Sequence, residues 1–173
     1  MKRHDCSRLL PVLACVLITL LLSIPIEVRA YQFNYESVHL GALHLGMTAA
    51  TLKKSSTCSF TTGKMELWEA DGLYHQKWRS TKCGISLDMQ SDKKKSIQTI
   101  GAIIVTAPST VATDLGIHIG SSENDTTAAY RSAINHEESI EHENLIVGSI
   151  YGGLSFMFKK GKVTQIFLGA AAE

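Results

Sequence analysis

The sequence predicts an α+β fold made of two tandem repeats, each a short helix packed on an antiparallel sheet of about three to four strands. The first observation is that the segment Leu43-His44-Leu45-Gly46-Met47-Thr48 returns as Ile117-His118-Ile119-Gly120-Ser121-Ser122. The second is that Gly84-Ile85-Ser86-Leu87 returns as Gly153-Leu154-Ser155-Phe156, each time before a lysine-rich turn and an apolar segment. We therefore expect one domain over residues 31–173, with repeats at about 38–105 and 114–170.

The first repeat is expected to begin with a strand over residues 38–45. Thr48 then follows a glycine, and its hydroxyl can cap a short helix over residues 49–54. Strands are expected at residues 64–69 and 73–78, because the Asp71-Gly72 pair between them is a strong hairpin signal. Alternating residues 85–89 and the apolar segment 97–105 supply the last two strands.

The second repeat follows a linker over residues 107–113. We expect a strand at 116–120, a helix capped by Ser121 or Ser122 that continues to Ile134, and a strand at 145–150. Residues 154–158 and 163–168 form a hairpin around the lysine-rich turn 159–162. Their alternating apolar residues indicate one buried face.

Residues 1–30 have the pattern of a secretory signal peptide. Basic residues precede an almost wholly apolar run over residues 9–26, and Val28-Arg29-Ala30 provides small residues for cleavage after Ala30. An uncleaved membrane anchor is one alternative, and it is the only membrane attachment we expect. Lipidation at Cys15 is the other, although the apolar run continues past that cysteine.

Cys58 and Cys83 are the two cysteines that remain after this leader, and we expect them to form a disulfide in an oxidising compartment. Free thiols or a metal site are the alternatives, but the spacing lacks a Cys-x-x-Cys pattern. Without the leader, basic and acidic residues are nearly equal in number. The composition therefore gives no electrostatic reason to expect a nucleic acid as a partner.

Aromatic residues around the Asp71-Gly72 turn are the candidates for binding a partner protein. Tryptophan, tyrosine and arginine dominate the energetics of protein interfaces, and this segment and a later loop contain Trp68, Tyr74, Trp78, Arg79 and Tyr151. The alternative is that the rings of the first repeat form its core.

Signals for metal binding and catalysis are weak. His136, Glu138 and His142 could contribute metal ligands, but a charge-rich segment of this kind is usually solvated. Ser91 and Lys94 have the Ser-x-x-Lys spacing of some acyl-transferring enzymes, but they lie in an expected turn rather than a helix. His44 and His118 occupy matching positions of the two repeats, where a structural role is expected. We expect no catalytic residue, metal or cofactor.

Two resemblances bear on these segments. Three groups of residues resemble the YfeY-type family of bacterial envelope lipoproteins, which has no established activity: Ile100, Ile103 and Val105; the segment 112–121; and Gly161-Lys162-Val163-Thr164-Gln165-Ile166. The Gly46-Met47-Thr48 junction is similar to those of the BamE outer-membrane assembly lipoproteins and of the tandem-repeat β-lactamase inhibitory protein; here the second copy departs to Gly120-Ser121-Ser122. Both imply a bacterial envelope protein that binds rather than catalyses, and neither supplies catalytic residues.

We therefore expect a non-enzymatic, periplasmic or secreted protein-binding module, such as an inhibitor, an immunity protein or an envelope-assembly protein. Its partner is expected to be another envelope or secreted protein. The alternative is a carrier of a small molecule or lipid, with the ligand between the sheet and the helices.

Overall fold

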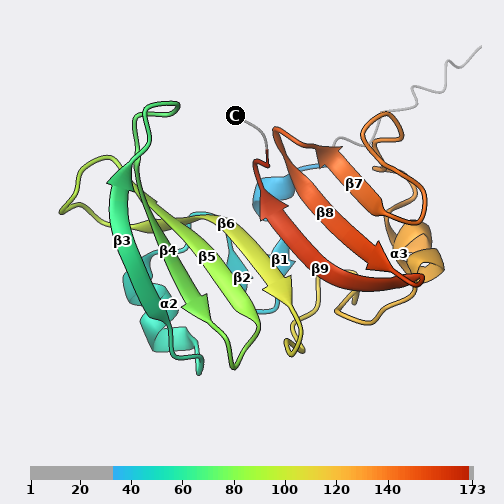
Figure 1. Cartoon of the computed structure of the whole chain (residues 1–173), viewed down its shortest axis with the longest axis horizontal. Helices are drawn as coiled ribbons and strands as arrows, with labels where there is room; N and C mark the ends of the chain where they lie inside the picture. The colour runs from blue at the N-terminus through green and yellow to red at the C-terminus, as the bar shows by residue number, and fades with distance from the viewer. Residues whose placement is uncertain (1–32, 172–173) are drawn as a thin grey trace, which may run out of the picture. The chain divides into compact units, whose positions relative to one another are not determined.

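The computed structural model describes residues 33–171 and shows an α+β fold, as the sequence predicts (Figure 1). The leader expected at residues 1–30 lies outside the described part of the chain. No helix within residues 33–171 is long and apolar enough to cross a membrane.

The elements follow one another along the chain in two series. The described chain begins with the 3-10 turn η1 (Tyr35–Ser37) and a small antiparallel pair, β1 (His39–Leu40) and β2 (Leu43–His44). Helix α2 and four strands come next: α2 (Ala49–Ser55), β3 (Thr61–Leu67), β4 (Tyr74–Ser80), β5 (Ile85–Ser91) and β6 (Thr99–Thr106). Helix α3 and three strands complete the fold: α3 (Glu123–Tyr130), β7 (Asn144–Ser149), β8 (Gly152–Lys159) and β9 (Lys162–Gly169).

A seven-stranded antiparallel sheet dominates the molecule, with the strand order β3-β4-β5-β6-β9-β8-β7. The strands β3–β6 form one meander and β7–β9 form another. The two meanders join where β6 pairs with β9, from Ile103 opposite Leu168 to Thr106 opposite Gln165. The last strand of each series therefore lies at the centre of the sheet.

Both helices begin with a side-chain cap, as the sequence predicts. Thr48 Oγ1 accepts a hydrogen bond from the backbone N–H of Thr51 at 3.1 Å, and Ser122 Oγ accepts one from Asp125 at 3.0 Å. Each cap satisfies one of the free N–H groups of a first helical turn.

The chain just before each helix is bonded to a central strand in the same way. The N–H of Gly46 donates to Ile100 O at 2.8 Å, and the N–H of Gly120 donates to Val163 O at 2.8 Å. Both glycines have a positive backbone φ, 75° and 94°, which residues with a Cβ rarely adopt. The backbone N–H groups of Ile100 and Val163 donate in return to Met47 O and Ser121 O, the carbonyls of the residues that follow these glycines. The start of α2 is thereby attached to β6, and the start of α3 to β9.

The core lies between the sheet and these helices. The fully buried side chains on this side of the sheet come from both meanders: Leu87, Met89, Ile100, Ile103, Val105, Leu154, Phe156, Ile166 and Leu168. Leu52 of α2 and Tyr130 of α3 pack into the same core. One continuous apolar layer therefore stabilises both halves.

Some expected elements differ from the observed ones. Residues 38–45 do not form one strand, because Gly41, with φ 59°, turns the chain between β1 and β2. Residues 116–120 contribute only an isolated bridge, between Ala112 and His118. The chain leaves α3 at Tyr130, four residues earlier than expected.

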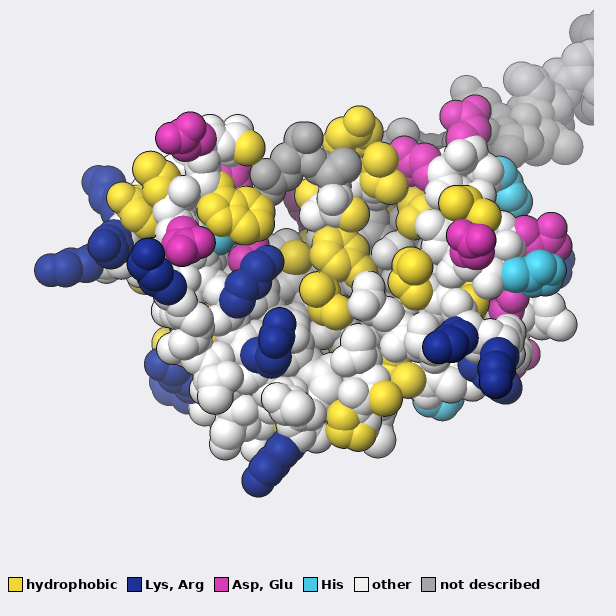
Figure 2. All heavy atoms as spheres, in the orientation of Figure 1, with side chains coloured by type: hydrophobic (Ala, Val, Ile, Leu, Met, Phe, Trp, Pro, Cys, Tyr) yellow, Lys and Arg dark blue, Asp and Glu magenta, His cyan; other side chains and the backbone are white. Residues whose placement is uncertain are grey.

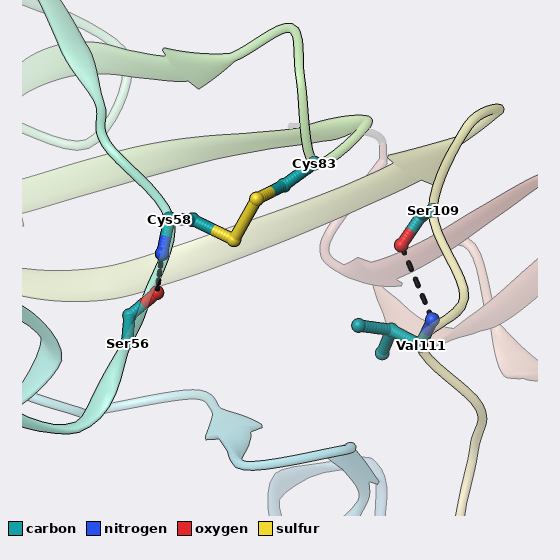
Figure 3. The surroundings of a disulfide bond; sticks show 5 residues. All are labelled: Ser56, Cys58, Cys83, Ser109 and Val111. Carbon is teal, nitrogen blue, oxygen red and sulfur yellow. Dashed lines mark hydrogen bonds between the residues drawn. A yellow bond between two sulfur atoms is a disulfide. The ribbon is translucent and has the colours of Figure 1, made fainter.

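The disulfide between Cys58 and Cys83 is present, as predicted (Figure 3). It links the segment between α2 and β3 to the turn between β4 and β5. Ser56 Oγ accepts a hydrogen bond from the Cys58 backbone N–H at 3.1 Å. The bond thus closes a loop that spans 25 positions of the sequence and contains the β3–β4 hairpin.

We predict that the double substitution Cys58→Ser and Cys83→Ser lowers the free energy of unfolding by about 3–4 kcal/mol, because an open chain of this length gains loop entropy on unfolding. Denaturant unfolding of the oxidised protein and the variant measures the difference. Reducing the original protein should lower its midpoint to that of the variant, and a reductant should leave the variant unchanged. Equal midpoints for the oxidised protein and the variant would contradict the prediction.

Candidate functional site

The two faces of the seven-stranded sheet have different surroundings. In Figure 1, α2, α3 and the β1–β2 pair lie behind the sheet, and no described helix covers the face toward the viewer. We call this uncovered side the open face. One row of paired positions crosses it from β7 to β4: Ile146, Ser155, Phe167, Ile104, Ser86 and Arg79.

Apolar side chains occupy the middle of the open face. Phe167 and Ile104 lie opposite each other on β9 and β6, and both are only half-buried. Met157 of β8 lies two residues after Ser155, on the same face of the sheet, and its side chain is 41% exposed. Figure 2 shows this group of hydrophobic side chains over the middle of the sheet. Large contiguous patches of exposed apolar side chains often mark interaction sites.

Cationic side chains border this apolar group on β4. Arg79 is exposed at the end of the row, and the side chain of Lys77 is 62% exposed. Lys77 Nζ lies 3.5 Å from Asp88 Oδ1 of the paired strand β5. Figure 2 shows lysine and arginine side chains beside the hydrophobic group.

A buried charged cluster lies at the same end of the open face. The ring of His75 on β4 is 2% exposed; its Nδ1 is 2.6 Å from Asp88 Oδ2 and its Nε2 is 2.8 Å from Asp71 Oδ2. The indole of Trp68 stacks on this ring with centroids 3.8 Å apart and planes at 8°. Lys77 Nζ lies 5.3 Å from the indole centroid, within cation–π distance.

Asp71 connects this cluster to the turn between β3 and β4. Its Oδ1 accepts a hydrogen bond from the Leu73 N–H at 2.9 Å, and this bond, with a smaller effect of His75, holds the pKa of the Asp71 carboxyl below its ordinary value. This contribution to stability is present above the carboxyl's unfolded pKa and is lost as the pH falls through its lower folded pKa.

The sequence-predicted aromatic residues separate into different environments. Trp78 is 4% exposed and packs in the core near Phe60, with Lys53 Nζ 5.2 Å from its ring centroid, so its ring has no exposed face for a partner. Trp68 and Tyr74 are half-buried. Arg79 is exposed on the open face, and Tyr151, 68% exposed, lies in the turn between β7 and β8.

Two of the three candidate metal ligands, Glu138 and His142, have other partners. Glu138 Oε2 accepts hydrogen bonds from Asn135 Nδ2 at 2.9 Å and from the Ile150 N–H at 3.0 Å, while His136 is exposed. His142 lies beside Glu123. Within residues 33–171, no group of three histidine, cysteine, aspartate or glutamate side chains is arranged to hold a metal ion.

A hollow on the helix side bears on the carrier alternative. It has a volume of about 170 Å³ and is lined by Phe33, Val38, Leu115, Tyr130 and neighbouring residues. Two other hollows measure about 460 Å³, beside His136 and His142, and about 480 Å³, beside Tyr35 and Gln90. Pockets for small ligands enclose most of the ligand surface, whereas each of these hollows is partly open to solvent.

The sequence interpretation placed His75 among the aromatic residues of the β3–β4 hairpin, but it missed the pairing of His75 with Asp71 and Asp88 and the apolar group of Ile104, Met157 and Phe167. One local signal was present, because Asp71 of the hairpin turn precedes His75 by four residues. No protein-family model, curated protein or solved structure matches this chain. The geometry of the described residues therefore carries the functional argument.

We predict that His142 titrates above its ordinary value of 6.5, because its ring nitrogen lies 3.2 Å from Glu123 Oε2 and the Glu123 carboxylate raises the pKa. Its contribution to stability is therefore complete below the unfolded pKa and is lost as the pH rises through the folded pKa. An NMR titration of the ring protons measures this, and Glu123→Gln should return the pKa toward its ordinary value. A His142 titration that Glu123→Gln leaves unchanged would contradict the assignment.

Proposed function

We propose that this chain is a non-enzymatic, exported protein-binding module, of the kind found among inhibitors, immunity proteins and envelope-assembly proteins. The observation that carries the proposal is the open face, where half-exposed apolar side chains meet cationic side chains on a rigid sheet. A preformed, well-paired surface of this kind costs little conformational entropy on binding.

The partner that this face fits is another envelope or secreted protein with an apolar ridge bordered by carboxylates. Phe167, Ile104 and Met157 provide the apolar contact. Arg79 and Lys77 provide positive charge at its border, and complementary charge across an interface selects partners and accelerates association.

We also infer that the two halves of the domain are copies of one supersecondary unit. Three features support this: a capped helix opens each half, Gly46 and Gly120 make equivalent bonds to central strands, and an antiparallel meander follows each helix. The open face would then extend across both copies, with its apolar group at their junction.

Export is part of the proposal, with cleavage of the leader after Ala30 and release into the periplasm or the medium of a bacterium. The basic and apolar pattern of residues 1–30 supports it. The Cys58–Cys83 disulfide also supports it, because such bonds form mainly in oxidising compartments.

We predict that Met157→Glu combined with Phe167→Ser reduces partner capture at least about tenfold, which corresponds to about 1.4 kcal/mol. The immobilised protein and its variants are exposed to the same envelope extract of the producing organism, and each captured protein is quantified by mass spectrometry. Circular dichroism and thermal melting check that the variant remains folded.

The matched control for this experiment is Leu115→Glu. It places a carboxylate on an apolar residue that is 56% exposed but lines the hollow on the helix side. The control should retain full capture. A protein captured stoichiometrically by all three forms would show binding elsewhere, and no specific capture by the original protein would count against the proposed function.

We predict that the exported protein begins at Tyr31. Intact-mass measurement and N-terminal sequencing of the protein recovered from the extracytoplasmic fraction test this directly. Ala30→Arg should retain the full-length chain in the membrane fraction, because a small residue is required before the cleavage site. A protein that begins at Met1 would favour the uncleaved anchor instead.

A further inference from the structure

The hydrogen bonds of His75 determine which form of its ring the cluster requires. Nδ1 faces Asp88 Oδ2 at 2.6 Å, and Nε2 faces Asp71 Oδ2 at 2.8 Å. Ionised carboxylate oxygens only accept hydrogen bonds, and a neutral imidazole carries a single N–H. With both carboxylates ionised, the two bonds exist together only when the ring is an imidazolium with two N–H donors.

The charges around the ring balance in this form. Two cations, the His75 imidazolium and the Lys77 ammonium, face two anions, Asp71 and Asp88. Glu66 of β3 lies opposite His75 in the register, but its carboxylate is 58% exposed and lies 3.7 Å from Lys64 Nζ. Loss of one proton from His75 would leave the inner cluster with an excess negative charge, and uncompensated charge is costly in a buried position.

Of the two carboxylates, Asp88 depends more on the positive charge of His75. Its side chain is 8% exposed, and its Oδ1 accepts no hydrogen bond from any residue within 33–171. Only the ion pair with Lys77 compensates this oxygen among the contacts of the described chain. The cluster therefore favours the doubly protonated ring.

His75 also connects the hairpin tip to the sheet. The tip, residues 68–73, is closed by a hydrogen bond from the Trp68 N–H to Leu73 O and by one from the Gly72 N–H to Trp68 O, both 2.9 Å. The tip contacts the ring of His75 twice, through the Asp71 carboxylate and through the stacked indole of Trp68. The charge on one ring thus affects both contacts.

We propose that His75 is a pH-sensitive latch of the open face: its doubly protonated ring holds Trp68 and the 68–73 tip against the sheet, and loss of one proton releases them. The latch deepens the proposed function and rests on it, because Trp68 and the tip lie at the end of the open face where Lys77 and Arg79 border the apolar group. As the pH rises, one carboxylate loses its N–H donor, and the indole of Trp68 loses one of its two cationic neighbours and keeps the other, Lys77.

The test uses the isolated protein. The chain contains two tryptophans, Trp68 and Trp78, so Trp78→Phe leaves Trp68 as the single indole reporter. An imidazolium in contact with an indole quenches its fluorescence more strongly than a neutral imidazole does. We expect Trp68 emission and its quenching by acrylamide to increase together as the pH is raised between about 5 and 10, at the midpoint where NMR shows His75 losing a ring proton.

Two variants of the tip distinguish the latch from a general charge effect. Asp71→Asn removes one carboxylate partner of the ring and should move the midpoint to lower pH. Glu69→Gln removes the same charge from an exposed position of the same tip and should move the midpoint much less. If Trp78→Phe does not fold, the two indole N–H signals of the unaltered protein replace fluorescence, and only that of Trp68 should shift at the transition.

Three results would overturn the latch: no transition of His75 in this range, a Trp68 signal that stays constant while His75 titrates, or equal midpoints for the Asp71→Asn and Glu69→Gln variants. Circular dichroism across the same range excludes global unfolding as the source of the signal. The latch is tested without a partner, so its outcome is independent of the capture experiment. The latch can fail while Met157 and Phe167 still determine capture, and capture can fail while the latch is observed.

Discussion

The pairing of β6 with β9 is the contact on which the rest of the structure depends. It joins the two meanders into one sheet through four paired positions, from Ile103 opposite Leu168 to Thr106 opposite Gln165. Because side chains alternate between the faces of a strand, the same contact places Ile103 and Leu168 in the core and Ile104 and Phe167 on the open face. Core stability and the proposed binding surface therefore share one backbone contact.

The second constraint is that both helices are attached to these central strands on the same side of the sheet. The bonds of Gly46 to Ile100 and of Gly120 to Val163 fix the start of each helix beside β6 and β9. Each helix contributes a residue to the core, Leu52 and Tyr130, while the other side has no described helix over it (Figure 1). The uncovered face thus follows from where the helices start.

The sequence predicted the features that depend on neighbouring residues. The caps at Thr48 and Ser122, the turn before β9 and the α+β class all follow from local patterns, and the even number of cysteines after residue 30 indicated the disulfide. The strand order and the burial of His75 depend on contacts between distant segments. His75 needs Asp88 from another strand, and neither residue is part of a motif that signals the pair. The environments of Trp68 and Trp78 could not be separated either, because they depend on the β3–β4 register, which shifts between Thr62 and Met65.

Strand β4 explains how a charged cluster can lie so close to the core. His75 and Trp78 are separated by an odd number of positions, so they project to opposite faces: Trp78 anchors the strand in the core, and His75 faces the tip. On β5, Leu87 pairs with Trp78 and Asp88 with Lys77, so the partners of the cluster are held by the same rigid pair of strands. Only Asp71 and Trp68 belong to a turn, and a turn is the part of a sheet that can move at low cost. A change of charge at His75 would therefore move the tip and leave the sheet in place, which is the behaviour that a regulated binding face requires.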